Sequence, residues 1–191
     1  MLEFVEETHS YFWNGDRVPS ITQVLVEAGI VETEFCKQSG TDRGSAVHLA
    51  CQFLDEGMLD ESSLDSVVVP YFEAYKRFKE ESGFVPDLIE HRFYNDHHGY
   101  AGTLDRTGVM NGRNVILEIK TSLKIDRWVG LQLVAQKASL QSIYDRYALQ
   151  LKDNGRYKLH SFTDENDFNV FLSALTIVKW EWNGGLNATH S

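Results

Sequence analysis

Apolar side chains recur every three to four residues in some stretches of the chain and every second residue in others. Helical spacing predicts helices at about 20–29, 42–54, 70–83, 126–147 and 165–180. Alternation predicts strands at about 88–94, 100–109, 114–121, 147–152 and 156–162, after an N-terminal hairpin that begins at Phe4. This order of elements predicts an α/β fold, in which helices flank a small central mixed β-sheet.

Residues typical of caps and turns mark the ends of several predicted elements. Ser20 precedes Gln23 at the spacing of a capping box, and Asp42 is expected to cap the second helix. Pro70 and Gly83 suit the start and the end of the third helix. Asn-Gly pairs favour two-residue hairpin turns because both residues tolerate positive φ. Such pairs begin at Asn14, Asn111, Asn154 and Asn183.

The turn at Asn111 determines how the two strands around it pair. If it is a two-residue loop, Asp105 faces Glu118, and Lys120 lies on the same face because side chains alternate along a strand. Two facing carboxylates repel each other, so positive charge is expected between them. The charge would come from Lys120 or from a divalent cation such as Mg²⁺, which typically binds one or two carboxylates together with substrate phosphate. A solvated hairpin face with an ordinary ion pair is the alternative interpretation.

The two strands also carry a family resemblance. Gly102-Thr-Leu-Asp105 followed by Glu118-Ile-Lys120 resembles the core of the PD-(D/E)xK nucleases, especially their RecB-type and phage exonuclease-like branch. A looser similarity extends from about residue 8 to about residue 180. The resemblance implies a restriction-endonuclease-like core and a single nuclease domain over 1–191. Its expected parts are an N-terminal hairpin with helices (1–85), a catalytic core (86–150) and a C-terminal hairpin with a helix (151–182).

Three flanking features extend the resemblance. Arg43-Gly-Ser-Ala-Val-His48 resembles the R-G-x-x-x-H element of the family, whose histidine often lies near the metal. Glu90 resembles an acidic residue that some members use as an extra metal ligand. Gln132 stands at the glutamine of the family's Q-x-x-x-Y helix, but Gln136 replaces the tyrosine and cannot stack as a tyrosine does. The residues alone also fit an ordinary packed or surface histidine and a surface strand glutamate.

Together these matches imply a metal-dependent deoxyribonuclease that uses Mg²⁺, with Mn²⁺ as a substitute. The implied mode is that of an exonuclease in phage or prophage recombination or repair. The expected catalytic residues are Asp105, Glu118, Lys120 and Gln132, with Lys120 orienting or activating the attacking water. The expected metal ligands are Asp105, Glu118, the carbonyl of Ile119, Glu90 and His48. The expected contacts to DNA come from Arg43, Arg106, Thr121, Ser122, Lys124, Arg127 and Trp128.

The charge distribution bears on the proposed substrate. The net charge of -10 by itself argues against binding nucleic acid, whose affinity comes largely from phosphate neutralisation. However, residues 104–152 hold eight Lys or Arg against four Asp or Glu, so this segment carries +4 and the rest -14. A local positive field can guide a polyanion, although chance clustering would give the same count. The acidic stretch 55–65 is predicted to be a solvated loop.

Other features narrow the protein class. No apolar run approaches the roughly 20 residues that a membrane helix needs, and the acidic N-terminus lacks a signal-peptide pattern, so we expect a cytoplasmic protein without a membrane partner. We expect Cys36 and Cys51 to be free thiols. Two cysteines cannot form the four-cysteine iron–sulfur cluster of some relatives, so no such cluster is expected.

Several functional alternatives stay open at this stage. A non-catalytic nucleic-acid-binding protein that retains the nuclease fold would share the motifs. A hydrolase of small phosphorylated molecules would use the same carboxylates. DNA is the expected partner, and a homo-oligomer or a phage recombination partner protein is compatible with the sequence.

Overall fold

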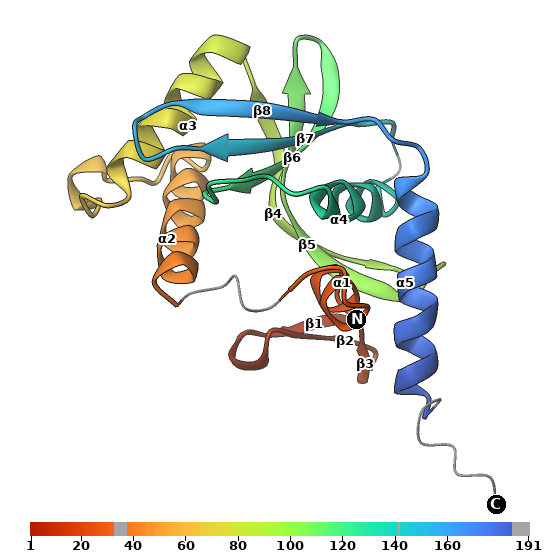
Figure 1. Ribbon diagram of the computed structural model, residues 1–191. Coiled ribbons are helices and arrows are strands. Elements are labelled where there is room, and N and C mark those ends of the chain that lie inside the picture. Colours follow the sequence, from red (N-terminus) through yellow and green to blue (C-terminus); the bar gives the residue numbers. More distant parts are fainter. Residues whose placement is uncertain (33–37, 141, 185–191) are drawn as a thin grey trace, which may run out of the picture.

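The computed structural model describes residues 1–32, 38–140 and 142–184, and in the second helix it describes side chains from residue 42 onward. Strands β1 (Leu2–Val5), β2 (Ser10–Trp13) and β3 (Asp16–Val18) form a small antiparallel sheet, with a 3₁₀ turn at Glu6–Thr8. Helices α1 (Ile21–Glu27), α2 (Gln38–Asp55) and α3 (Val69–Ser82) follow, with a second 3₁₀ turn at Glu61–Ser63 (Figure 1).

A five-stranded sheet forms the centre of the molecule. Its strands are β4 (Val85–Asn95), β5 (Tyr100–Met110), β6 (Arg113–Lys120), β7 (Asp145–Leu151) and β8 (Tyr157–Phe162), in this spatial order. Helix α4 (Trp128–Lys137) connects β6 to β7, which makes this pair parallel, whereas all other neighbours are antiparallel. Helix α5 (Asp167–Trp182) follows β8. The predicted α/β fold with a mixed sheet and flanking helices is confirmed.

Apolar side chains form two separate clusters, one with α2 and α3 and the other with α1, α4 and α5. Val115, Leu117 and Ile119 of β6 belong to the first cluster, and Ile116 belongs to the second. Since side chains alternate along a strand, Glu118 has the same parity as Ile116 and faces α4. The small sheet lies beside α1, at the end of the molecule to which α5 extends (Figure 1).

The hairpin between β5 and β6 has the register that the sequence predicts. Asn111 and Gly112 both adopt positive φ, at 52° and 74°, and Met110 pairs with Arg113. The ladder continues to the pair of Arg106 and Leu117 and ends there. The two strands therefore separate one pair before the level of Asp105 and Glu118, and side chains bond the backbone groups beyond that point.

Local capping signals are confirmed at two helices. The Ser20 hydroxyl accepts a hydrogen bond of 3.1 Å from the Gln23 amide at the start of α1. Pro70 lies in the first turn of α3, and Gly83 ends that helix in the left-handed region at φ 63°. Asp42 does not cap α2, because this helix already begins at Gln38.

Two predicted elements are wrong in part. The helix predicted at 126–147 already ends with α4 at Lys137. The strand predicted at 147–152 is confirmed as β7, but it begins at Asp145, inside the range predicted as helix, because its pairing with β6 starts there. The acidic stretch 55–65 is not wholly a solvated loop either, because the Asp55 side chain is fully buried at the end of α2.

Within the described residues, no helix combines the length and the apolar composition needed to cross a bilayer. Cys51 is a free, buried thiol, and Cys36 lies outside the described residues.

Candidate active site

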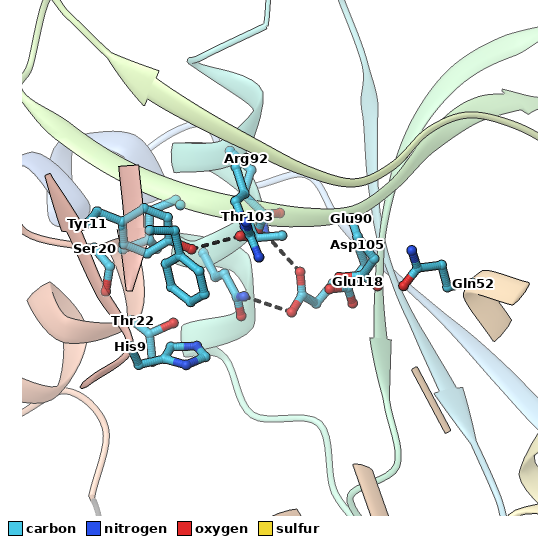
Figure 2. Close-up of a pocket in the computed structure, with 15 residues that line it drawn as sticks. His9, Tyr11, Ser20, Thr22, Gln52, Glu90, Arg92, Thr103, Asp105 and Glu118 are labelled. Atoms are coloured by element: carbon cyan, nitrogen blue, oxygen red, sulfur yellow. Dashed lines mark hydrogen bonds between the residues drawn. The ribbon is translucent and has the colours of Figure 1, made fainter. Parts of the chain in front are cut away.

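Three acidic residues lie at one level on three neighbouring strands. In the pairing of β4 with β5, Glu90 stands opposite Asp105, between two recorded pairs. Extending the pairing of β5 with β6 by one residue places Glu118 opposite Asp105 on the other side. Glu90 adopts a left-handed φ of 46°, close to an irregularity in the β4–β5 register. A glutamate is rarely found in this region because its side chain crowds the backbone there. All three acids line one cavity of about 470 Å³, and Figure 2 shows them side by side, with Gln52 beyond them.

His48 of α2 joins two of these acids in a tight group. Its Nδ1 atom lies 3.6 Å from Asp105 Oδ1 and 3.7 Å from Glu90 Oε1. One ligand atom from each of the three side chains lies within 4.8 Å of the other two. The Nε2 atom of His48 lies 3.1 Å from the carbonyl oxygen of Ile119. Because a carbonyl oxygen can only accept a hydrogen bond, Nε2 of His48 carries the hydrogen. Metal-binding histidines typically donate from the second ring nitrogen in this way.

The clustering of carboxylates shifts the pKa values of the group. Burial by itself lowers the pKa of His48, but the charges of Asp105 and Glu90 outweigh it and raise the pKa to about 9. Burial, followed by the neighbouring charge of Glu118, raises the pKa of Asp105 to about 7. Burial also acts to raise the pKa of Glu90, yet His48 and Arg106 together lower it. The group carries excess negative charge that a proton or a divalent cation can offset.

Glu118 is buried beneath α4 and has different partners. Its Oε1 atom accepts from Lys120 Nζ at 2.9 Å and from Gln132 Nε2 at 2.7 Å, and its Oε2 atom accepts from Gln136 Nε2 at 2.9 Å. Gln132 and Gln136 are one helical turn apart and therefore lie on the same face of α4. Asp105 and Glu118 line the same cavity, but the tight group consists of His48, Glu90 and Asp105.

The backbone of Ile119 is bonded to the site at both ends. Its amide donates to Asp105 Oδ2 at 2.6 Å, and its carbonyl accepts from His48. These bonds take the place of the β5–β6 ladder beyond the point where the strands separate. A carbonyl oxygen has two lone pairs, so metal binding by the Ile119 carbonyl stays a prediction.

Arg106 lies inside the protein, so the prediction that it contacts DNA is wrong. Its side chain is 0% exposed, with Nε donating to Asp55 Oδ2 at 2.7 Å and Nη1 to Glu90 Oε1 at 2.8 Å. Asp55 also accepts from the Tyr75 hydroxyl at 2.7 Å and from Lys79 Nζ at 2.5 Å. Arg106 thus neutralises a buried aspartate and holds Glu90. The sequence did not indicate that Asp55 is buried, because this residue begins the acidic stretch 55–65, which is typical of a solvated loop.

The other predicted DNA contacts surround the segment between β6 and α4. Lys124 is paired with Asp126 at 2.6 Å and Arg127 with Asp164 at 3.0 Å. Exposed ion pairs contribute little free energy, so both cations are available to a phosphate. The Lys120 ammonium lies 5.3 Å from the ring centroid of Trp128. Ser122, Lys124 and Arg127 are exposed, and Arg43, Thr121 and Trp128 are half-buried.

The far wall of the cavity comes largely from the N-terminal segment, which the sequence did not indicate. The hydroxyls of Tyr11 and Thr103 lie 2.7 Å apart there (Figure 2). The Ala101 amide of β5 donates to the Pro19 carbonyl at 2.9 Å, which ties this segment to the larger sheet. Further polar residues of this wall are His9, Ser20, Thr22 and Arg92. A second hollow of about 400 Å³ opens beside His48 and shares Glu90 with the first.

Comparisons with known proteins find structural neighbours but no match by sequence. No protein-family model matches the chain, and no curated protein matches its sequence. A structure of LHK-Exo in complex with dAMP is 14% identical, with a TM-score of 0.45 over 88% of this chain and 89% of that chain. A structure of an alkaline exonuclease (LHK-Exo) from Laribacter hongkongensis is 12% identical, with a TM-score of 0.37 over 89% of this chain and 94% of that chain. Likeness at this level carries no weight for function, which is therefore inferred from the site.

Proposed function

We propose that this protein is a metal-dependent deoxyribonuclease that hydrolyses phosphodiester bonds. The supporting observation is the group of His48, Glu90 and Asp105, whose ligand atoms lie within 4.8 Å of one another. Two carboxylates and one imidazole suit a divalent ion, and the predominance of oxygen fits Mg²⁺ or Mn²⁺. The raised pKa of Asp105, caused first by burial and next by Glu118, fits a site that requires positive charge.

The metal would be held by His48, Glu90 and Asp105, with Glu118 and the Ile119 carbonyl as further candidates. When bound, the ion would polarise a phosphate and lower the pKa of a bound water. Lys120 is held at 2.9 Å from Glu118 and 3.3 Å from Gln132 Oε1, so its ammonium group has a defined position beside the cavity. From there it would orient the attacking water or stabilise negative charge on the phosphate in the transition state.

The surface beside the site suits a DNA strand. Lys124 and Arg127 follow Lys120 closely along the chain, and their side chains are 82% and 87% exposed. Cations placed in this way contact phosphates without reading sequence. Action at DNA ends, and a role in phage or prophage recombination or repair, follow from the motif resemblance and belong to the proposal.

Ligand-linked thermal unfolding, together with a gel assay, tests the proposal. At a metal concentration of 100 times Kd the free energy of unfolding should rise by about 2.7 kcal/mol. For a domain of about 150–250 residues this corresponds to a Tm increase of about 5–10 °C. Asp105→Asn should abolish the increase, whereas the control Asp145→Asn, at the far end of β7, should retain it.

End-labelled linear, circular and single-stranded DNA should be cleaved only when Mg²⁺ or Mn²⁺ is present. A wild-type protein that neither gains Tm with these ions nor cleaves DNA would exclude the proposed activity. DNA binding under the same conditions would then favour a non-catalytic binding protein. Turnover of a small phosphate ester that DNA does not inhibit would favour a small-molecule hydrolase.

A further inference from the structure

Resting on the proposed function, we infer that Gln136 is a positioning residue that sets the orientation of Glu118 at the metal site. Gln136 is 1% exposed, and its amide nitrogen donates to Glu118 Oε2 at 2.9 Å and to the Thr103 carbonyl at 3.2 Å. It therefore connects β5 with the Glu118 carboxylate beyond the end of the β5–β6 ladder. The motif of the PD-(D/E)xK nucleases has a tyrosine at this position, so the resemblance implies no role for a glutamine there.

The number of hydrogen bonds that Glu118 can accept shows which of its oxygens the bond from Gln136 orients. A carboxylate offers about four lone-pair sites, two on each oxygen. Lys120 and Gln132 occupy both sites on Oε1, and Gln136 occupies one on Oε2. In this set of contacts the remaining site is on Oε2, the oxygen that Gln136 holds. Gln136 thus orients the oxygen through which Glu118 would reach a cation.

A glutamine can do this in a way that a tyrosine cannot. Its amide has two N–H donors, and both are used here, whereas a tyrosine has a single O–H donor. A tyrosine could bond either Glu118 or the Thr103 carbonyl by donation, but not both. The second bond fixes the amide plane, because the nitrogen is held from two elements at once.

The two acceptors explain why position 136 carries an amide. Among the described residues, Oε1 of Gln136 is buried without a hydrogen-bond partner. An apolar side chain of similar size would avoid this unpaired oxygen, but it would leave Glu118 Oε2 and the Thr103 carbonyl without the N–H groups that now bond them. The two N–H donors, and not the oxygen, are therefore the part of Gln136 that the site uses.

A double-mutant cycle with metal affinity as the readout tests this role. Gln136→Met removes both donors with little change in volume, and Glu118→Gln removes the carboxylate that they hold. In the otherwise wild-type chain, Gln136→Met should raise the Kd for Mn²⁺, measured by calorimetry, by about 10- to 100-fold, as losses of groups that orient metal ligands typically do. In the Glu118→Gln chain the same change should alter the Kd less than about twofold, because a residue that acts only through Glu118 has nothing left to orient.

Gln150→Met is the matched control. Gln150 is also a buried glutamine, and its amide donates to the Ser122 carbonyl at 2.8 Å and to the Leu123 carbonyl at 2.9 Å. Its oxygen is also bonded, to His160 Nε2 at 3.2 Å. None of these bonds involves Glu118, so the loss of Gln150 should leave the Kd for Mn²⁺ unchanged. If Gln136→Met does not unfold cooperatively in EDTA, Gln136→Tyr, which keeps one donor, replaces it and should give a smaller increase in Kd.

Two results would overturn the role of Gln136 while leaving the nuclease proposal intact. One is an unchanged Kd in the Gln136 variant, and the other is an equal increase in Kd in both backgrounds. A wild-type chain that binds no Mn²⁺ at all would instead remove the proposed function, and the role of Gln136 with it.

Discussion

Replacing Arg106 by methionine should destabilise the fold strongly, because it leaves two carboxylates without their main partner. The Arg106 and Asp55 side chains are both 0% exposed, and Arg106 also holds Glu90 at 2.8 Å. Removing one partner of a buried ion pair typically costs about 3–5 kcal/mol. Lys79 and Tyr75 still bond Asp55 in the variant, so we expect the lower end, about 3 kcal/mol. With an m-value of about 3 kcal/mol/M, the urea midpoint should fall by about 1 M.

Equilibrium urea unfolding without metal measures this loss, and two variants control it. Arg113→Met removes an arginine that is 78% exposed and paired with Asp145 at 3.4 Å, so it should change stability by less than about 0.5 kcal/mol. Adding Asp55→Asn to Arg106→Met should recover part of the loss, because the double variant no longer buries an uncompensated aspartate.

The opposite pattern would refute the structural role of Arg106. If Arg106→Met left the urea midpoint within about 0.3 M of the wild type and weakened DNA binding, the arginine would be a DNA contact, as its position in the basic segment had suggested. No recovery in the double variant would show that Asp55 is not its energetic partner.

Two further predictions concern catalysis and DNA binding. Lys120→Ala should abolish DNA cleavage while the Tm increase with Mn²⁺ persists, because Lys120 bonds Oε1 of Glu118, whereas Glu118 would reach a cation through Oε2, which Gln136 holds. Equal loss of both would assign Lys120 to metal binding. Lys124→Glu and Arg127→Glu should each weaken DNA binding for all sequences and reduce the slope of log K against log salt by about 1. An unchanged slope, measured by fluorescence anisotropy at several salt concentrations, would place the strand elsewhere.

Much of the β5–β6 strand pair could be predicted because its geometry is local. An Asn-Gly turn requires positive φ at both positions, and this fixes the pairing of Met110 with Arg113 and of the residues that follow. Alternation along the strand then places Glu118 and Lys120 on one face. The same holds for the Ser20 cap and for the end of α3 at Gly83, where one residue's chemistry decides the local conformation.

The number of Lys and Arg residues in the segment 104–152 overstates the positive charge that this segment exposes. Sequence counts Arg106 and Arg146 with the exposed cations, yet both are buried in ion pairs, Arg106 with Asp55 and Arg146 with Asp167 at 2.9 Å. Whether a charged side chain points to solvent or to a buried partner depends on elements that are distant in the chain. The Arg106 partner, for example, is 51 residues away.

By itself, the sequence determined the chemistry of the central hairpin, because turn type and strand periodicity act over a few residues. The resemblance named His48, Glu90 and Asp105 as metal ligands, but only the tertiary structure decided that they form a tight group apart from Glu118. It also decided that α4 ends at Lys137 and that Gln136 holds Glu118. Each of these depends on contacts between separate elements, such as the bond from His48 to Ile119 across 71 residues. Such contacts arise from packing the helices onto the sheet, which no local pattern specifies.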